Sequence, residues 1–405
     1  MSGASLLAAR DWSGSAPKPD AAVDVPKVAE VVAPTIRDPD LVEFIRAAHH
    51  ADESGDPLQR CLSFPSWPGN AWPAGLAAAH CHLAFDPVPS LADVGTALDS
   101  GDLATLDARY QALLDSHFDA VAPNEGLHLA LERFDISADA DVTSARWLEL
   151  APDSAWARLA RGAHLHAVAA HLLEDGEDGP AAPSDRAAGA ALAVEATTLY
   201  QDALAIEPRL MPAHAGVAGL ALAIGDDAAA VEALVAGEAI DPACLALVHT
   251  RIAQLGPRHG GTAEAAHAHL AALRAAHPQR VLLALAAADE ALAGGRSMLH
   301  HERFAEAQRE LRPALTGTTS PEAFEDAAIA SVRAPMPDHD AALGMLVAAS
   351  RYQTGRTVVR ELRARLLMEA GERTWALSIL NDVPAEPAAM SRLLAVGPRR
   401  ITEPL

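Results

Sequence analysis

The stretch AVEATTLYQDALAIEP, residues 193–208, decides the fold of this chain. Small residues stand at Ala196 and Ala203, Tyr200 lies between them, and Pro208 closes the stretch. Apolar or small residues recur on one side of a 3.6-residue period, which predicts an amphipathic helix. We expect the two alanines to let a neighbouring helix approach closely, while the tyrosine fills the space between them as a larger knob.

The same order of residues returns once along the chain. Thirty-four residues after the first pattern, Ala230, Leu234 and Gly237 repeat its spacing and Pro242 repeats its final proline. A unit of this length and order resembles the second helix of a tetratricopeptide repeat. The resemblance implies an all-α fold, a tetratricopeptide-like right-handed α-solenoid of helical hairpins. We expect Gly225 to break the chain between the two helices of one hairpin.

The composition fits a helical protein that binds neither nucleic acid nor membranes. Of its 405 residues 50% are hydrophobic but only 4% are aromatic, so we expect a core of small and aliphatic side chains. A formal net charge of −23 leaves no basic patch for nucleic acid or for an anionic membrane surface. No run of eighteen apolar residues predicts membrane insertion.

The cysteines and the N-terminus predict a cytoplasmic location. The three cysteines are widely spaced and form no C-x-x-C pair, which is typical of a reducing compartment, so we expect no disulfide framework. The N-terminal apolar run has no basic region ahead of it, so a secretory signal is not predicted.

Changes in composition along the chain suggest four parts. An Ala- and Pro-rich start reads as a flexible leader, and an acidic Gly/Pro insertion interrupts one hairpin. We interpret the insertion as a solvated linker or as a binding loop. The predicted parts are the leader (1–38), an N-terminal helical region (39–120) with a Trp/Pro-rich ordered segment (61–75), tetratricopeptide-like repeats (121–293) with the acidic loop (174–187), and C-terminal helical repeats (294–405).

The Trp/Pro-rich segment offers a second place for a site. It carries Trp67 and Trp72 among prolines and glycines, and a short helix with His80 and His82 follows. We expect the aromatic side chains to pin the N-terminal part onto the repeats, with ligand stacking as the alternative. Adjacent helical residues point about 100° apart, so these histidines do not converge on one metal, and a partly buried histidine with a hydrogen-bond partner is the simpler interpretation.

Two longer stretches resemble one particular family. SWPGNAWPAGLAAAHCHLAFD (66–86) and WLELAPDSAWARLARG (147–162), with the hairpin at 91–118 between them, are similar to a bacterial family carried as a domain of unknown function. The resemblance covers roughly residues 60 to 255 and rests on the Trp/Pro segment and on the Pro-x2-Ala-x5-Arg-Gly spacing that begins at Pro152. It implies a tetratricopeptide-like helical fold and brings no catalytic residues.

The sequence contains no motif that predicts a catalytic residue, a metal ligand or a cofactor. The chain has no G-x-S-x-G elbow, and a phosphate loop is excluded because its last lysine is Lys27. His301-Glu302 begins a zinc-protease pattern whose second histidine is replaced by Ala305. The histidine pairs have spacings of one or two residues, whereas a helix presents two ligands together at spacings of three or four.

Two classes of function remain. The sequence favours a non-enzymatic interaction scaffold or adaptor that binds a protein or peptide segment in a concave apolar groove. The alternative is an enzyme or small-ligand-binding protein with its site near Trp67, Trp72, His80 and His82. Because the groove lacks a lysine and asparagine clamp for a carboxylate terminus, we expect a partner with an apolar or helical segment. The expected groove residues are Trp156, Leu159, Arg158, Arg161, His166 and Leu222.

The groove has a competing interpretation. Trp156 is the expected anchor, with Arg158 and Arg161 as rim contacts in an otherwise acidic protein. Trp156 would instead have a structural role if it packed under the neighbouring hairpin, or if the leader or the Trp67/Trp72 segment filled the groove in cis.

Overall fold

The computed structural model describes residues 38–119, 125–173, 181–352 and 357–381, and every regular element in these ranges is a helix. The all-α class is confirmed. Except for Asp38, the predicted leader lies outside the described residues, as do residues 174–180 of the acidic loop. The helix after that loop begins at Pro183, so the loop's last predicted residues are helical.

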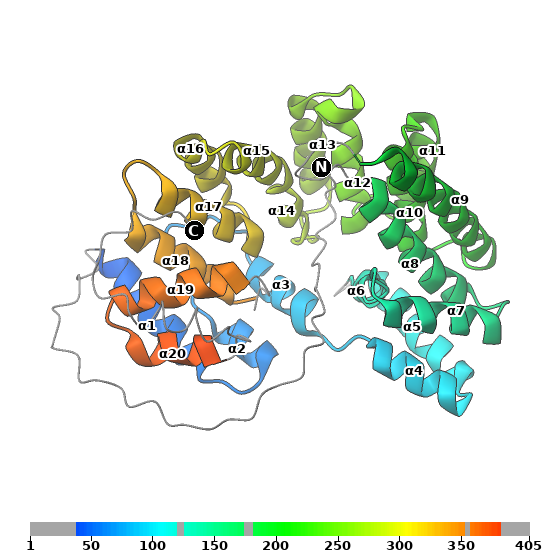
Figure 1. The fold of residues 1–405 in the computed structure, drawn as a ribbon, viewed down its shortest axis with the longest axis horizontal. Helices are drawn as coiled ribbons and strands as arrows, with labels where there is room; N and C mark the ends of the chain where they lie inside the picture. The colour runs from blue at the N-terminus through cyan, green and yellow to red at the C-terminus, as the bar shows by residue number, and fades with distance from the viewer. Residues whose placement is uncertain (1–37, 120–124, 174–180, 353–356, 382–405) are drawn as a thin grey trace. The chain divides into compact units, whose positions relative to one another are not determined.

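The described chain divides into two compact units (Figure 1). The first contains the described residues within 71–294 together with 313–319, and the second contains those within 38–70, 295–312 and 320–381. The N-terminal helices before residue 71 therefore belong with the C-terminal helices. The helices of the first unit are α3 (Leu76–Phe85), α4 (Leu91–Ser100), α5 (Leu103–His117), α6 (Gly126–Glu132), α7 (Ala138–Leu150), α8 (Ala155–Leu173), α9 (Pro183–Ile206), α10 (Met211–Ile224), α11 (Asp227–Glu238), α12 (Leu245–Leu255), η1 (Pro257–His259), α13 (Ala263–Ala276) and α14 (Leu283–Ala286).

Pairs of consecutive helices pack together in the first unit. The pairs α8/α9, α10/α11 and α12/α13, drawn in green in Figure 1, are each in contact, and α10 also contacts α8, α9 and α12. Tyr200 of α9 is 3% exposed and reaches the backbone of Gly162 on α8 and of Gly216 on α10. The tyrosine knob between small residues is thus present. Gly225, at φ +83°, ends α10 in the left-handed conformation that glycine adopts without strain.

Helix α5 contacts the turns before three later helices, and we call it the α5 strap. Ser154, just before α8, donates a hydrogen bond to Asp107 of the strap at 3.1 Å. The guanidinium of Arg209, before α10, lies 3.8 Å from the carboxylate of Asp115. At the end of the strap the imidazole of His117 is 3.0 Å from the carboxylate of Asp241, before α12. The strap therefore links three successive turns.

The second unit is built around an aromatic cluster. The ring of Trp67 meets those of Phe44 and Phe324 edge to face, with centroids 5.6 and 5.5 Å apart. Its helices are α1 (Pro39–Asp52), α2 (Pro57–Ser63), α17 (Pro321–Arg333), α18 (His339–Ser350), α19 (Thr357–Glu369) and α20 (Arg373–Asn381), and α15 (Asp289–His300) and α16 (Phe304–Ala314) cross the boundary between the units.

A buried arginine caps the C-terminal end of α18 in the second unit. Arg60 of α2 is 6% exposed and donates hydrogen bonds to the backbone carbonyls of Ser350 and Arg351 at 3.1 and 2.8 Å, and to the carboxylate of Asp52 at 2.7 Å. These carbonyls lie at the C-terminus of α18, where no backbone N–H of the same helix reaches them.

Two observations concern location. Within the described residues no helix combines the length and the apolar character that a membrane span needs. Cys244 is a buried free thiol, whereas Cys61 and Cys81 are disulfide-bonded. The expectation of reduced thiols is wrong for these two, so a cytoplasmic location stays a prediction without support from the cysteines.

Candidate functional site

The apolar residues expected in the groove are buried. Trp156 is 6% exposed and Leu222 is 8% exposed, while Leu159 has no exposed surface. The indole of Trp156 lies 6.1 Å from the ring of Tyr110 on α5, measured between centroids. Trp156 therefore packs against another helix of the chain, and it offers little free surface to a partner.

The two arginines expected at the rim face acidic side chains of their own chain. Arg161 lies 2.6 Å from the carboxylate of Asp141 and 3.3 Å from the hydroxyl of Ser144. Arg158 lies 4.0 Å from the carboxylate of Asp202, at the limit of an ion pair. A partner that used either arginine would compete with these contacts.

His166 packs against the tyrosine knob. Its Nδ1 is 3.3 Å from the hydroxyl of Tyr200. Burial, and then the nearby His128 of α6, lower the pKa of His166 to about 4, so the ring is neutral at neutral pH. A neutral, half-buried imidazole that bonds a core tyrosine serves packing between α8 and α9.

The residues of the alternative site have structural contacts. Trp67 lies in the aromatic cluster of the second unit, whereas the indole of Trp72 donates a hydrogen bond to the carbonyl of Leu315 in the first unit at 3.1 Å. The ring of His80 is buried, 2.9 Å from the hydroxyl of Thr319. His82 is paired with the carboxylate of Asp86 at 2.9 Å on the surface. These contacts give Trp67, Trp72 and His80 packing roles.

Another part of the chain packs on α10 beside its neighbouring helices. All residues of α10 from Met211 to Leu222 are buried or half-buried, and α10 packs mainly against α8, α9, α11 and α12. Phe118, at the end of the strap, packs on the cluster that contains Met211 and Ala215. His128 of α6 lies near enough to His166 to affect its pKa. Phe118 and α6 therefore cover parts of α10 and α8, two helices that were expected to line the groove.

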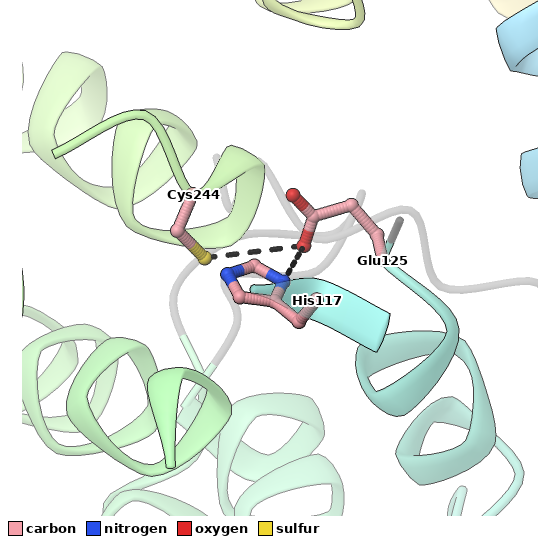
Figure 2. A group of neighbouring side chains, drawn as sticks. All are labelled: His117, Glu125 and Cys244. Atoms are coloured by element: carbon pink, nitrogen blue, oxygen red, sulfur yellow. Dashed lines mark hydrogen bonds and ion pairs between the residues drawn. The ribbon is translucent and has the colours of Figure 1, made fainter. Parts of the chain in front are cut away.

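A group of reactive side chains meets where His117, at the end of the strap, and Glu125, just before α6, approach the start of α12. His117 is the last residue of the strap, Glu125 precedes α6, and Cys244 precedes α12. Figure 2 shows the three side chains pointing toward one another. One donor atom from each, an imidazole nitrogen, a carboxylate oxygen and the sulfur, all lie within 4.8 Å of one another. The three residues are 3%, 6% and 1% exposed.

Two further charged residues complete this cluster. Asp241 accepts a hydrogen bond from Nε2 of His117 at 3.0 Å and another from the backbone N–H of Ala243 at 3.0 Å. The guanidinium of Arg280 pairs with the same carboxylate. Glu125 accepts a hydrogen bond from the backbone N–H of Leu245 at 3.1 Å.

The cluster shifts the pKa of its members in different directions. Burial disfavours the imidazolium of His117, but the hydrogen bond to Asp241 and the charges of Glu125 and Asp241 outweigh it, so the pKa of His117 is raised. Burial also opposes ionisation of Asp241, yet His117 and Arg280 together lower its pKa. Burial and the charge of Glu125 raise the pKa of the Cys244 thiol. Cys244 is thus a poor nucleophile without a further positive charge beside it.

Sequence reasoning missed this cluster. Metal ligands can be recognised in a sequence when they stand at short spacings, whereas His117 and Asp241 are separated by 124 positions along the chain. The available signal was weak: Cys244 and Asp241 both stand in the turn that ends one hairpin and begins the next.

Comparison with known proteins adds no identification. No protein-family model matches the sequence, and no curated protein matches it. The resemblance to tetratricopeptide-like proteins stays a prediction.

Proposed function

We propose that this chain is a non-enzymatic interaction scaffold, built as a tetratricopeptide-like solenoid, whose partner offers an apolar helical segment. The packed pairs α8/α9, α10/α11 and α12/α13 support the architecture, because each first helix also contacts the first helix of the next pair. The alternative of a ligand site near Trp67, Trp72, His80 and His82 gains no support from the contacts of these residues.

The observation that carries the proposal is the place of α6. Leu127, Ala130 and Leu131 of this short helix are buried at i, i+3 and i+4 spacing, and α6 contacts α8. Two residues that precede α6 in the sequence contact the next two first helices: Phe118 packs on α10, and Glu125 accepts a hydrogen bond from the start of α12. This is how an amphipathic helix binds in a groove.

The partner we propose therefore competes with α6. Trp156 and Leu159 belong to the same apolar core as Leu127 and Leu131, so displacement of α6 would expose part of the predicted groove. The partner need supply only an apolar helical segment of about two turns, because α6 itself has seven residues.

A peptide with the sequence of residues 125–134, EGLHLALERF, tests the proposal. The wild-type chain and the double variant Leu127→Ala/Leu131→Ala are titrated with the labelled peptide in an anisotropy experiment. We expect the double variant to bind the peptide at least about tenfold more tightly, because its own α6 is loosened and competes less.

Two controls make the result specific. Val142→Ala changes an aliphatic residue that is 65% exposed on α7, and it should bind the peptide as the wild type does. A peptide that carries both alanine substitutions should bind neither protein. Equal affinity of the wild type and the double variant would reject the proposal. Loss of the helical circular dichroism signal in the double variant would also reject it, because α6 would then be an indispensable part of the core.

A further inference from the structure

We propose that His117, Glu125 and Cys244 bind one zinc ion, which fastens the end of the α5 strap to the start of α12. This inference goes beyond the scaffold function and does not depend on it. The residues come from three elements, and all three are buried (Figure 2).

The distances between the donor atoms suit a tetrahedral ion. Nδ1 of His117 lies 3.5 Å from Oε2 of Glu125, and Sγ of Cys244 lies 3.9 Å from the same oxygen. Ligands bonded to zinc at about 2.0–2.3 Å stand roughly 3.3–3.8 Å apart at tetrahedral angles. These two distances are within a few tenths of an ångström of the tetrahedral values, and all three donor atoms lie within 4.8 Å of one another.

The surrounding hydrogen bonds orient the donors. Asp241 accepts the Nε2–H of His117, and Nδ1 lies on the side of Glu125. The backbone N–H of Leu245 bonds Oε1 of Glu125 and leaves Oε2 facing the other two donors. A carboxylate on the second nitrogen of a ligand histidine is a recurring feature of zinc sites.

The charges of the cluster also suit a dication with a thiolate. Glu125 and Asp241 bring two negative charges and Arg280 brings one positive charge, which leaves one negative charge when His117 is neutral and Cys244 is a thiol. A zinc ion and the Cys244 thiolate together add one positive charge and make the buried cluster neutral. An isolated buried charge is costly, and zinc binding creates none; without the metal, the raised pKa of His117 lets its imidazolium balance the same carboxylates.

The chemistry of the donors selects the metal. Sulfur and imidazole ligands disfavour magnesium and calcium, which prefer oxygen, and a mixed set of nitrogen, oxygen and sulfur is typical of zinc. The described residues supply three of the four ligands of a tetrahedral zinc site.

Metal titration of the purified full chain tests the site. The chain is stripped with a chelator, and zinc is added during calorimetry. We expect one zinc ion per chain, with affinity lowered at least about 100-fold by Cys244→Ser and by His117→Gln, and about 10–100-fold by Asp241→Asn. His214→Gln is the matched control, because His214 is also buried but bonds the carbonyl of Pro208 at 3.1 Å.

Cobalt substitution gives a second readout that needs no variant. Because Cys244 is the free cysteine of the described chain, a thiolate-to-cobalt absorption band in the wild type would report on this residue. We expect this band together with the visible spectrum of tetrahedral cobalt. Absence of the band overturns the proposal, even if a variant fails to fold. Zinc affinity that is unchanged in folded Cys244→Ser, or lost equally in His214→Gln, overturns it as well.

Discussion

The ring of Tyr200 packs directly on the backbone of Gly162: a β-carbon at position 162 would lie 2.9 Å from Cε1 of the ring. The other side of the ring lies against Gly216 of α10, where a β-carbon would come closer still. One side chain thus occupies the space that two glycines leave, and it couples α8, α9 and α10.

Replacement of this tyrosine should destabilise the first unit. We expect Tyr200→Ala to lower the free energy of unfolding by about 3–5 kcal/mol, because it leaves a cavity between three helices. Tyr200→Phe, which loses only the hydroxyl near His166, should cost about 1 kcal/mol. Chemical denaturation followed by circular dichroism measures both, and an unchanged midpoint for Tyr200→Ala would place the residue on the surface.

The stability of the first unit should fall in mild acid through His166. Its pKa is about 4 in the folded chain against an ordinary value of 6.5. Between these values the unfolded chain binds a proton that the folded chain does not, so stability present above pH 6.5 is lost as the pH falls. From about pH 7.5 to about pH 5 this residue should account for a loss of about 2 kcal/mol.

The variant His166→Gln isolates this contribution, because glutamine does not titrate and can still bond Tyr200. The loss of stability between the two pH values should be about 2 kcal/mol smaller in the variant than in the wild type. Equal losses in both proteins would show that folding does not lower the pKa of His166.

Phe118 should stabilise the end of the α5 strap more than the ion pair between Arg209 and Asp115 does. The ring is half-buried against α10, and the guanidinium of Arg209 lies 5.6 Å from its centroid. We expect Phe118→Ala to cost about 2 kcal/mol, less than a fully buried phenylalanine does. Arg209→Ala should cost at most about 1 kcal/mol, because its carboxylate partners are exposed to solvent or lie close in sequence. Urea denaturation compares the two variants, and a larger cost for Arg209→Ala would contradict this ranking.

Replacement of Arg60 by lysine should destabilise the second unit. Its guanidinium bonds the carbonyls of Ser350 and Arg351 and the carboxylate of Asp52 together. A lysine ammonium cannot reproduce this fork, so Arg60→Lys should cost about 1.5–3 kcal/mol. Arg46→Lys, on the exposed side of α1, should have no measurable effect. Thermal unfolding monitored by tryptophan fluorescence tests the pair.

The local rules predicted the helices well. The side chains of Asp38 and Ser90 cap the starts of α1 and α4, as local preferences lead one to expect, and Gly225 and Gly371, both at positive φ, follow the ends of α10 and α19. Tyr200 lies at the predicted packing position because periodicity and residue size determine which side of a helix is buried. These features depend on residues a few positions apart.

The site could not be predicted in the same way. An apolar residue such as Trp156 indicates that a helix face is covered, but not whether a partner or the chain itself covers it. Here Tyr110, from a helix more than thirty positions earlier, supplies part of the cover. The cluster of His117, Glu125 and Cys244 depends on the path of the strap, and no spacing within one helix encodes that path.

The α5 strap also imposes an order on folding. The ribosome makes His117 long before Asp241, its partner 124 positions later, so the strap has to wait for the last of its three turns. Neighbouring hairpins can form as soon as they are made, since their contacts are local. Closure of the strap is therefore a late, long-range step, and the nascent chain should stay sensitive to proteases until the start of α12 has left the exit tunnel.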